Sequence, residues 1–89
     1  MFRLWAKIWK DNHLIKDIVI ENDDNTLNRT RKVFAAIDSV CYTFDLSKPM
    51  WLDSTVREFQ RYDKARFTQD NFVDSIDFDY LEIHFIEED

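Results

Sequence analysis

Apolar and polar residues alternate in the first part of the chain, over residues 2–10 (FRLWAKIWK) and again over residues 13–21 (HLIKDIVIE). Alternation with a period of two is typical of β-strands, because successive side chains point to opposite faces of a sheet. Residues 2–10 also fit a short basic helix lying on a membrane surface, with an apolar stripe formed by Leu4, Trp5, Ile8 and Trp9. The way in which the two segments would pair favours the strand.

The charges of the two segments match if they form an antiparallel hairpin. With a three-residue loop at residues 11–13, Lys7 faces Asp17 and Arg3 faces Glu21, whereas a two-residue loop would oppose two lysines. Opposite charges and matched apolar groups stabilise neighbouring strands, so we predict the hairpin with the longer loop. On one face of this hairpin the predicted pairs are Trp5 with Val19 and Trp9 with Ile15.

A different period begins near Thr26. Apolar residues then recur every three or four positions, which is typical of one face of an α-helix, at Leu27, Phe34, Ile37, Cys41 and Phe44. Pro49 ends this pattern, since proline cannot continue a helix and disfavours helical geometry in the residue before it. Residues 49–52 (PMWL) are too few to assign, with a brief edge strand as one alternative, and residues 53–63 (DSTVREFQRYD) predict a second, shorter helix.

The polar segment at residues 66–74 (RFTQDNFVD) is similar to an active site in composition, but its spacing indicates the start of a helix. Thr68 is a suitable N-cap, and Phe67 and Phe72 then occupy the two positions that a hydrophobic staple brings together. Arg66 is left over from this explanation, and beside free backbone amides its cation could hold an anion. We therefore interpret the segment mainly as architecture.

The last segment, residues 77–88 (DFDYLEIHFIEE), alternates again and predicts a strand. If this strand lies beside the first one, Glu82 can pair with Arg3 or Lys7. Together the elements predict one two-layer α+β domain, residues 1–89. Its small mixed sheet would consist of the N-terminal hairpin and the C-terminal strand, with two or three helices on one face. A right-handed crossover would place the last strand next to the first, in a β-grasp-like topology.

Composition narrows the classes of function. Hydrophobic residues make up 45% of the 89 residues, enough for a modest core. The chain has no glycine, so phosphate-binding loops and dinucleotide fingerprints cannot be built, and turns would fall to Asn and Asp, which tolerate positive φ. The single cysteine cannot form an internal disulfide, and the apolar runs are far shorter than the ~20 residues that span a bilayer. We therefore expect a cytoplasmic location.

Charge is unevenly distributed along the chain. Residues 1–69 hold all 12 Lys and Arg beside 10 acidic residues, whereas residues 70–89 hold 8 acidic residues and no Lys or Arg, and the net charge is −6. Nucleic-acid binding depends on cations that contact phosphates, so this balance argues against general nucleic-acid affinity. We expect the acidic last strand to lie beside the basic first strand and to neutralise it.

The residues form no recognisable catalytic motif, and we expect neither an enzyme nor a bound cofactor. Cys41 falls on the apolar stripe of the first helix, where a cysteine is usually an inert core residue. Asp77 and Asp79 would point to one face of an extended chain, where Asp74 or His84 could join them around a hard cation. Acidic clusters are more often solvated, and the spacing of a calcium-binding loop is absent, so we assign no catalytic, cofactor-binding or metal-binding residue.

Two surfaces remain as candidates for binding. The outer face of the predicted sheet would carry Trp5, Trp9, Ile15, Val19, Tyr80 and Ile86. This much apolar surface predicts a site for another protein or a second copy of the chain, unless the stems of Arg3, Lys7 and Lys16 cover it. The second surface is a basic face formed by Arg57, Arg61, Lys64 and Arg66, the first three on one side of the second helix.

Three segments, WLDSTVREF (51–59), RFTQDNF (66–72) and SIDFDYLEIHFIEED (75–89), resemble a family of short uncharacterised proteins from Gram-positive bacteria. The resemblance covers nearly the whole chain, implies a bacterial cytoplasmic protein and transfers no activity or site residues. The residues themselves favour a small non-enzymatic protein-interaction domain that binds a protein partner or forms a homodimer through the outer sheet face. The alternative is an anion or nucleic-acid binder, and the third is a peripheral membrane protein that binds through residues 1–10.

Overall fold

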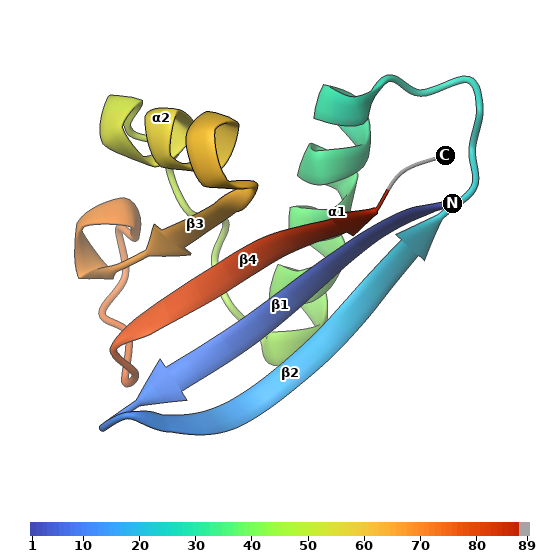
Figure 1. Ribbon diagram of the computed structural model, residues 1–89. Coiled ribbons are helices and arrows are strands. Elements are labelled where there is room, and N and C mark those ends of the chain that lie inside the picture. Colours follow the sequence, from blue (N-terminus) through green and yellow to red (C-terminus); the bar gives the residue numbers. More distant parts are fainter. Residues whose placement is uncertain (88–89) are drawn as a thin grey trace.

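The computed structural model describes residues 1–87 and shows a four-stranded antiparallel sheet with two α-helices (Figure 1). The order of the strands in the sheet is β2-β1-β4-β3. The predicted α+β class is confirmed, with two α-helices. In chain order the elements are β1 (Phe2–Lys10), β2 (His13–Asn22), α1 (Arg29–Phe44), α2 (Asp53–Tyr62), β3 (Lys64–Phe67), the 3₁₀ turn η1 (Gln69–Asn71) and β4 (Tyr80–Glu87).

The N-terminal hairpin is confirmed, with the predicted register over most of its length. Arg3 lies opposite Glu21, with Nε and Oε2 2.9 Å apart, and Lys7 lies opposite Asp17. Residues 2–10 are extended, so the interpretation of this segment as a helix on a membrane surface is wrong. Within residues 1–87, neither helix is long and apolar enough to cross a bilayer.

The loop of the hairpin differs from the prediction. Asp11 and Asn12 have φ angles of 52° and 64°, and they form a two-residue turn that normally favours glycine. The register shifts between Ile8 and Trp9, where Ile15 forms a bulge without a partner on β1. Trp9 therefore pairs with Leu14, and its predicted pairing with Ile15 is wrong. The bulge compensates for the shorter loop, which is why the register of residues 3–7 agrees with the prediction.

The sheet is antiparallel throughout, so the prediction of a mixed sheet is wrong. β4 lies beside β1 as expected but runs antiparallel to it. The difference arises from β3, an additional four-residue strand that pairs with β4 and reverses the chain once more. A right-handed crossover connects parallel strands, so the strand order fits the β-grasp-like topology whereas the direction of β4 does not. Residues 49–52 form no strand.

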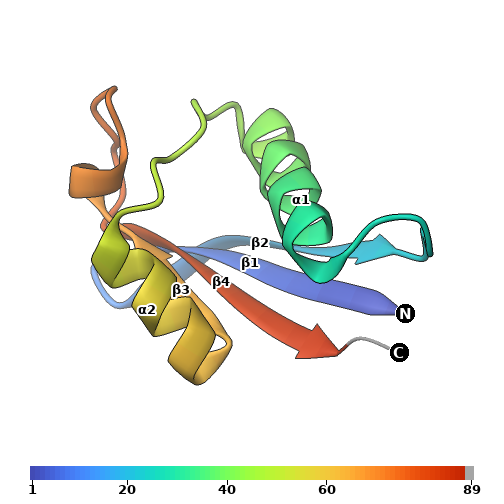
Figure 2. The same ribbon diagram turned by 90° about the horizontal axis from the view of Figure 1, so that it is seen from above.

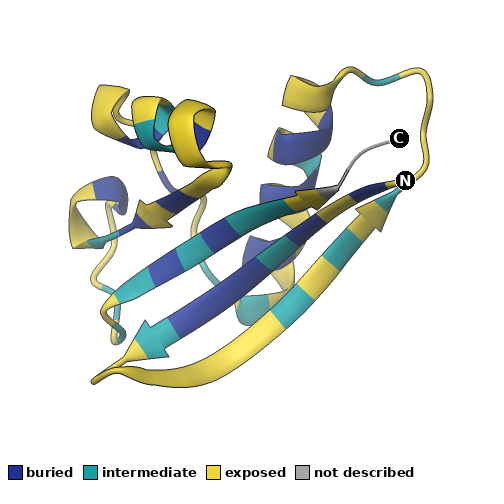
Figure 3. Ribbon diagram, in the orientation of Figure 1, coloured by how far each residue is buried: buried dark blue, intermediate teal, exposed yellow. Residues whose placement is uncertain are grey.

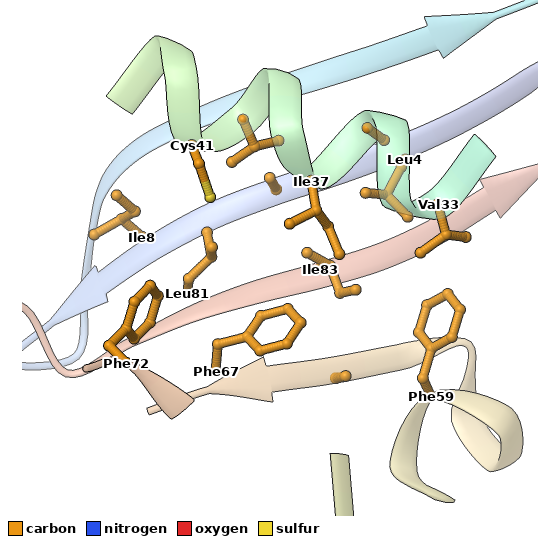
Figure 4. Close-up of a cluster of buried hydrophobic side chains, with 14 of the residues drawn as sticks. Leu4, Ile8, Val33, Ile37, Cys41, Phe59, Phe67, Phe72, Leu81 and Ile83 are labelled. Carbon is orange, nitrogen blue, oxygen red and sulfur yellow. The ribbon is translucent and has the colours of Figure 1, made fainter. Parts of the chain in front are cut away.

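The hydrophobic core lies between α1 and the sheet, with α2 beside the β3 edge (Figure 4). α1 begins after Asn28, whose side chain accepts a hydrogen bond from the Arg31 backbone N–H at 2.9 Å. Trp51, in the connection between the helices, packs edge-on against Phe67 with ring centroids 5.0 Å apart. The fully or nearly fully buried side chains come from β1, α1, β3, β4 and the end of η1, and they include Leu4, Val33, Ile37, Val40, Phe67, Phe72, Leu81 and Ile83.

The segment RFTQDNFVD forms a capped turn, as its spacing predicts. The Asn71 side chain accepts a hydrogen bond from the Thr68 backbone N–H at 3.0 Å. In return, the Thr68 side chain accepts a hydrogen bond from the backbone of the turn, and the two contacts together form a capping box. Phe67 and Phe72 on either side are buried. The helix is limited to one 3₁₀ turn, and Asn71 also donates to the Met50 carbonyl at 2.8 Å. The polar residues therefore connect the turn to the core.

Candidate interaction surface on the outer face of the sheet

The outer face is the side of the sheet that points away from α1. Seen from above in Figure 2, α1 lies on one side of β1, β2 and β4. Leu4, Ala6 and Ile8 are buried on that side. The residues that alternate with them, Trp5, Lys7 and Trp9, point to the outer face. Figure 3 shows alternating buried and less buried positions along β4, whereas Ala6, Lys7 and Ile8 of β1 are all buried.

The strand register brings the predicted outer-face residues together. Trp5 lies between Val19 on β2 and His84 on β4. Trp9 lies opposite Tyr80. Ile86 lies two residues beyond His84 on β4, at a register shift where it has no partner on β1. Of the six predicted residues, four occupy paired positions on this face, namely Trp5, Trp9, Val19 and Tyr80, and Ile15 and Ile86 lie at register shifts at its two ends.

A row of charged groups crosses the middle of the outer face. The Lys7 ammonium lies 3.1 Å from Glu82 Oε1 and 3.9 Å from the centre of the Trp5 ring system. Arg66 Nε is 3.8 Å from Glu82 Oε2, and its guanidinium lies 4.8 Å from the centre of the Tyr80 ring. The ammonium of Lys7 and the guanidinium of Arg66 thus cover part of the aromatic surface, and the charges balance locally. The predicted pairing of the acidic last strand with the basic first strand is confirmed in the Lys7–Glu82 contact.

Exposed apolar side chains remain around this charged row. Val19 is 46% exposed and Ile86 45% exposed. Leu14 and Ile15, near the tip of the hairpin, are 44% and 52% exposed. Sequence reasoning missed Leu14, because its position opposite Trp9 depends on the bulge. The outer face is therefore partly apolar and open, with a polar centre.

His84 occupies the outer face beside Trp5. Partial burial lowers the pKa of His84, and the neighbouring ammonium groups of Lys64 and Lys7 lower it further. Glu82 acts in the opposite direction. The imidazole is consequently neutral at pH 7, so it adds no net charge to the face.

The four residues of the predicted basic face do not lie on one helix. Arg57 and Arg61 are exposed on α2, which ends at Tyr62. Lys64 and Arg66 belong to β3, where they lie opposite His84 and Glu82. The prediction that Lys64 shares a helical face with the two arginines is therefore wrong. The cause is Asp63, whose left-handed conformation (φ 56°) ends the helix.

A groove between α1 and α2 was not predicted from the sequence. Its volume is about 370 Å³, and aromatic and aliphatic side chains form most of its walls. Phe34, expected in the core, is 49% exposed here and packs edge-on against Trp51 with ring centroids 6.0 Å apart. Arg29 lies at the rim and pairs with Asp63 at 2.9 Å. No periodicity in the sequence reports how the two helices are placed.

The residues considered for catalysis or metal binding take part in the core and in the hairpin turn. Burial raises the pKa of the Cys41 thiol to about 11, so little reactive thiolate forms near neutral pH. Asp79 accepts a hydrogen bond from the Asp11 backbone N–H at 2.9 Å and so holds the hairpin turn. Among residues 1–87, three or more His, Cys, Asp or Glu side chains nowhere come together in a group that could hold a metal ion.

Comparisons with models of known protein families, with curated proteins and with solved structures give no significant match.

Proposed function

We propose that this protein is a small non-enzymatic interaction domain that binds another protein through the outer face of its sheet. A second copy of the chain is the first partner to test. The supporting observation is a face without helix cover in the described part of the chain, which exposes Val19 beside Trp5 and Ile86 near the end of β4. Exposed apolar residues around partly buried aromatic groups are typical of protein-binding surfaces.

The distribution of charge favours a protein over a nucleic acid or a lipid surface. The cations at the centre of the face, Lys7 and Arg66, both contact Glu82, so they are already paired. The chain as a whole carries a net charge of −6, which opposes approach to phosphates. Tyrosine, tryptophan and arginine on one surface are enriched in protein interfaces. A cytoplasmic location is part of the proposal, because the one cysteine is free and buried.

Sedimentation velocity over a range of concentrations tests self-association. Trp5→Glu and Ile86→Glu place a carboxylate on the outer face, and they should shift the protein towards the monomer because burying an unpaired charge is unfavourable. Ile86→Glu is the milder change, since this side chain is half-exposed already. Far-ultraviolet circular dichroism establishes that each variant is folded.

Val73→Glu is the matched control. Val73 is 81% exposed in the loop before β4, outside the outer face, and the same kind of substitution there should leave association unchanged. If the wild-type protein and all variants sediment as folded monomers at every concentration, self-association through the outer face is wrong. An equal loss of association in Val73→Glu would show that added negative charge, rather than the outer face, is responsible.

A further inference from the structure

β2 is a long strand at the edge of the sheet. It spans His13–Asn22 and pairs with β1 on one side, and on the other side no strand of residues 1–87 lies next to it (Figure 1). Most of its residues are exposed, and it contains neither proline nor glycine. Proteins usually protect such an edge by short length, proline, bulges or charges, because its free backbone groups can pair with another strand. Here the bulge at Ile15 disturbs one end of β2, and Asp17–Glu21 remains a regular open segment.

The direction of the free backbone groups follows from the register. The Phe85 backbone N–H donates to the Asp63 carbonyl, on the β3 side of β4, so the groups of the neighbouring His84 point towards β1. His84 faces Trp5, whose backbone groups therefore point towards β4, and Val19 on the other side of Trp5 is not hydrogen-bonded to it. Backbone groups of successive residues point alternately to the two sides of a strand. Along β2, the N–H and C=O groups of Asp17, Val19 and Glu21 therefore point away from β1, towards the open edge.

We propose that β2 of one copy pairs antiparallel with β2 of a second copy, around a two-fold axis at Ile18. The two four-stranded sheets then form one continuous sheet of eight strands. Directly opposed residues of an antiparallel pair lie on the same face, so the two-fold axis must pass through a residue and not between two residues. This leaves a small number of registers to compare.

Charge decides among these registers. An axis at Asp17 would oppose two aspartates, an axis at Lys16 would oppose two lysines, and an axis at Val19 would set Asp17 against Glu21. An axis at Ile18 sets Asp17 against Val19 and Lys16 against Ile20, so that no like charges face each other. It also opposes Asp17 and Val19, two residues whose backbone groups point outwards, as hydrogen bonding between the edges requires. An axis at Ile20 would set Asp17 against Asp23, just beyond the end of β2.

The proposed β2–β2 pairing predicts that a positive and a negative charge at position 19 change the dissociation constant of the dimer in opposite directions. In the proposed register, residue 19 of each copy faces Asp17 of the other, so Val19→Lys should strengthen dimerisation and Val19→Glu should weaken it. Each dimer contains this pair twice, which gives a change of roughly two- to thirtyfold in the dissociation constant in each direction. Val19 also lies on the outer face, where docking through apolar contacts would be weakened by both substitutions.

The experiment is sedimentation equilibrium at 0.15 M NaCl, up to roughly millimolar protein, with both substitutions placed in the Ile86→Glu background. This background disables the outer face, so a failure of the edge pairing is distinguishable from a failure of the proposed function. The expected result is a dimer that Val19→Lys tightens and Val19→Glu loosens. Val19→Pro in the same background should abolish the dimer without unfolding the protein, because the N–H that it removes points to solvent in the monomer.

Two results would overturn the edge pairing. One is a monomer at all concentrations in the Ile86→Glu background, even with Val19→Lys present. The other is weaker association with both charged substitutions. Neither of these two results involves the Val19→Pro variant, so the edge pairing can still be tested if that variant fails to fold.

Discussion

Removing the Lys7 charge should destabilise the fold strongly, although Lys7 lies on a face that no helix covers in the described residues. Its ammonium is 3.1 Å from Glu82, and the two side chains are only 11% and 14% exposed. Breaking a buried ion pair from one side costs about 3–5 kcal/mol, because the remaining charge is left in a poorly solvated site. Arg66 stays 3.8 Å from Glu82 and compensates in part, so we expect a loss of about 3 kcal/mol in Lys7→Met.

The expected loss can be compared with the free energy of unfolding of the whole domain. A domain of this length has a free energy of unfolding of about 4–13 kcal/mol, and about 3 kcal/mol corresponds to a fall in Tm of about 12–24 °C. Urea unfolding followed by circular dichroism measures it. The double variant Lys7→Met/Glu82→Leu should regain most of the stability, because it leaves neither charge unpaired.

Arg3→Met is the control on the same strand. Arg3 pairs with Glu21 at 2.9 Å, but these side chains are 45% and 51% exposed, so the expected loss is below about 1 kcal/mol. If Lys7→Met unfolds at the same urea concentration as the wild type, the Lys7–Glu82 pair is hydrated in solution. The inference that Lys7 and Glu82 form a poorly solvated ion pair would then be wrong.

Three further predictions concern single residues. Burial lowers the pKa of His84 from 6.5, so its contribution to stability should be fully present above pH 6.5 and should be lost as the pH decreases below this value. Urea unfolding over a pH series measures this loss, which should be smaller in His84→Gln. Cys41, with a thiol pKa of about 11 and 2% exposure, should react with a disulfide reagent at neutral pH only after denaturant is added. Asp45→Gly should stabilise the protein by about 1 kcal/mol in urea unfolding, because Asp45 has a left-handed conformation (φ 56°) that glycine adopts more readily. Ser39→Gly within α1 is the control and should lower the free energy of unfolding by a similar amount. A gain in stability in both variants would contradict this explanation.

The hairpin was predictable because its sequence specifies both faces of two strands at once. The Arg3–Glu21 pairing and the Trp5–Val19 neighbours follow from one register. The loop length was misjudged because it was chosen from the pairing of side chains alone, and a two-residue turn with a bulge at Ile15 gives the same pairs for residues 3–7 as a three-residue loop without a bulge. Because β3 has only four residues, its alternation of exposed and buried positions is too short to be distinguished from a loop.

The outer face was predictable to the extent that it depends on alternation alone. Trp5, Trp9 and Tyr80 needed only the correct period and the neighbourhood of β4 and β1. The cover that Arg66 provides over Tyr80 could not be predicted, because it requires β3 and its register. The groove beside Phe34 depends on the relative position of two helices, which the sequence leaves open.

The outer face and the β2 edge are linked through one residue. Val19 contributes its side chain to the outer face beside Trp5, and by the alternation of the ladder its backbone groups face the open edge. Pairing of two edges around Ile18 would bring both copies of Val19 close to the two-fold axis and join the outer faces into one surface twice as wide. A protein bound there would contact both copies and favour the dimer, because its affinity for the joined surface exceeds that for either half.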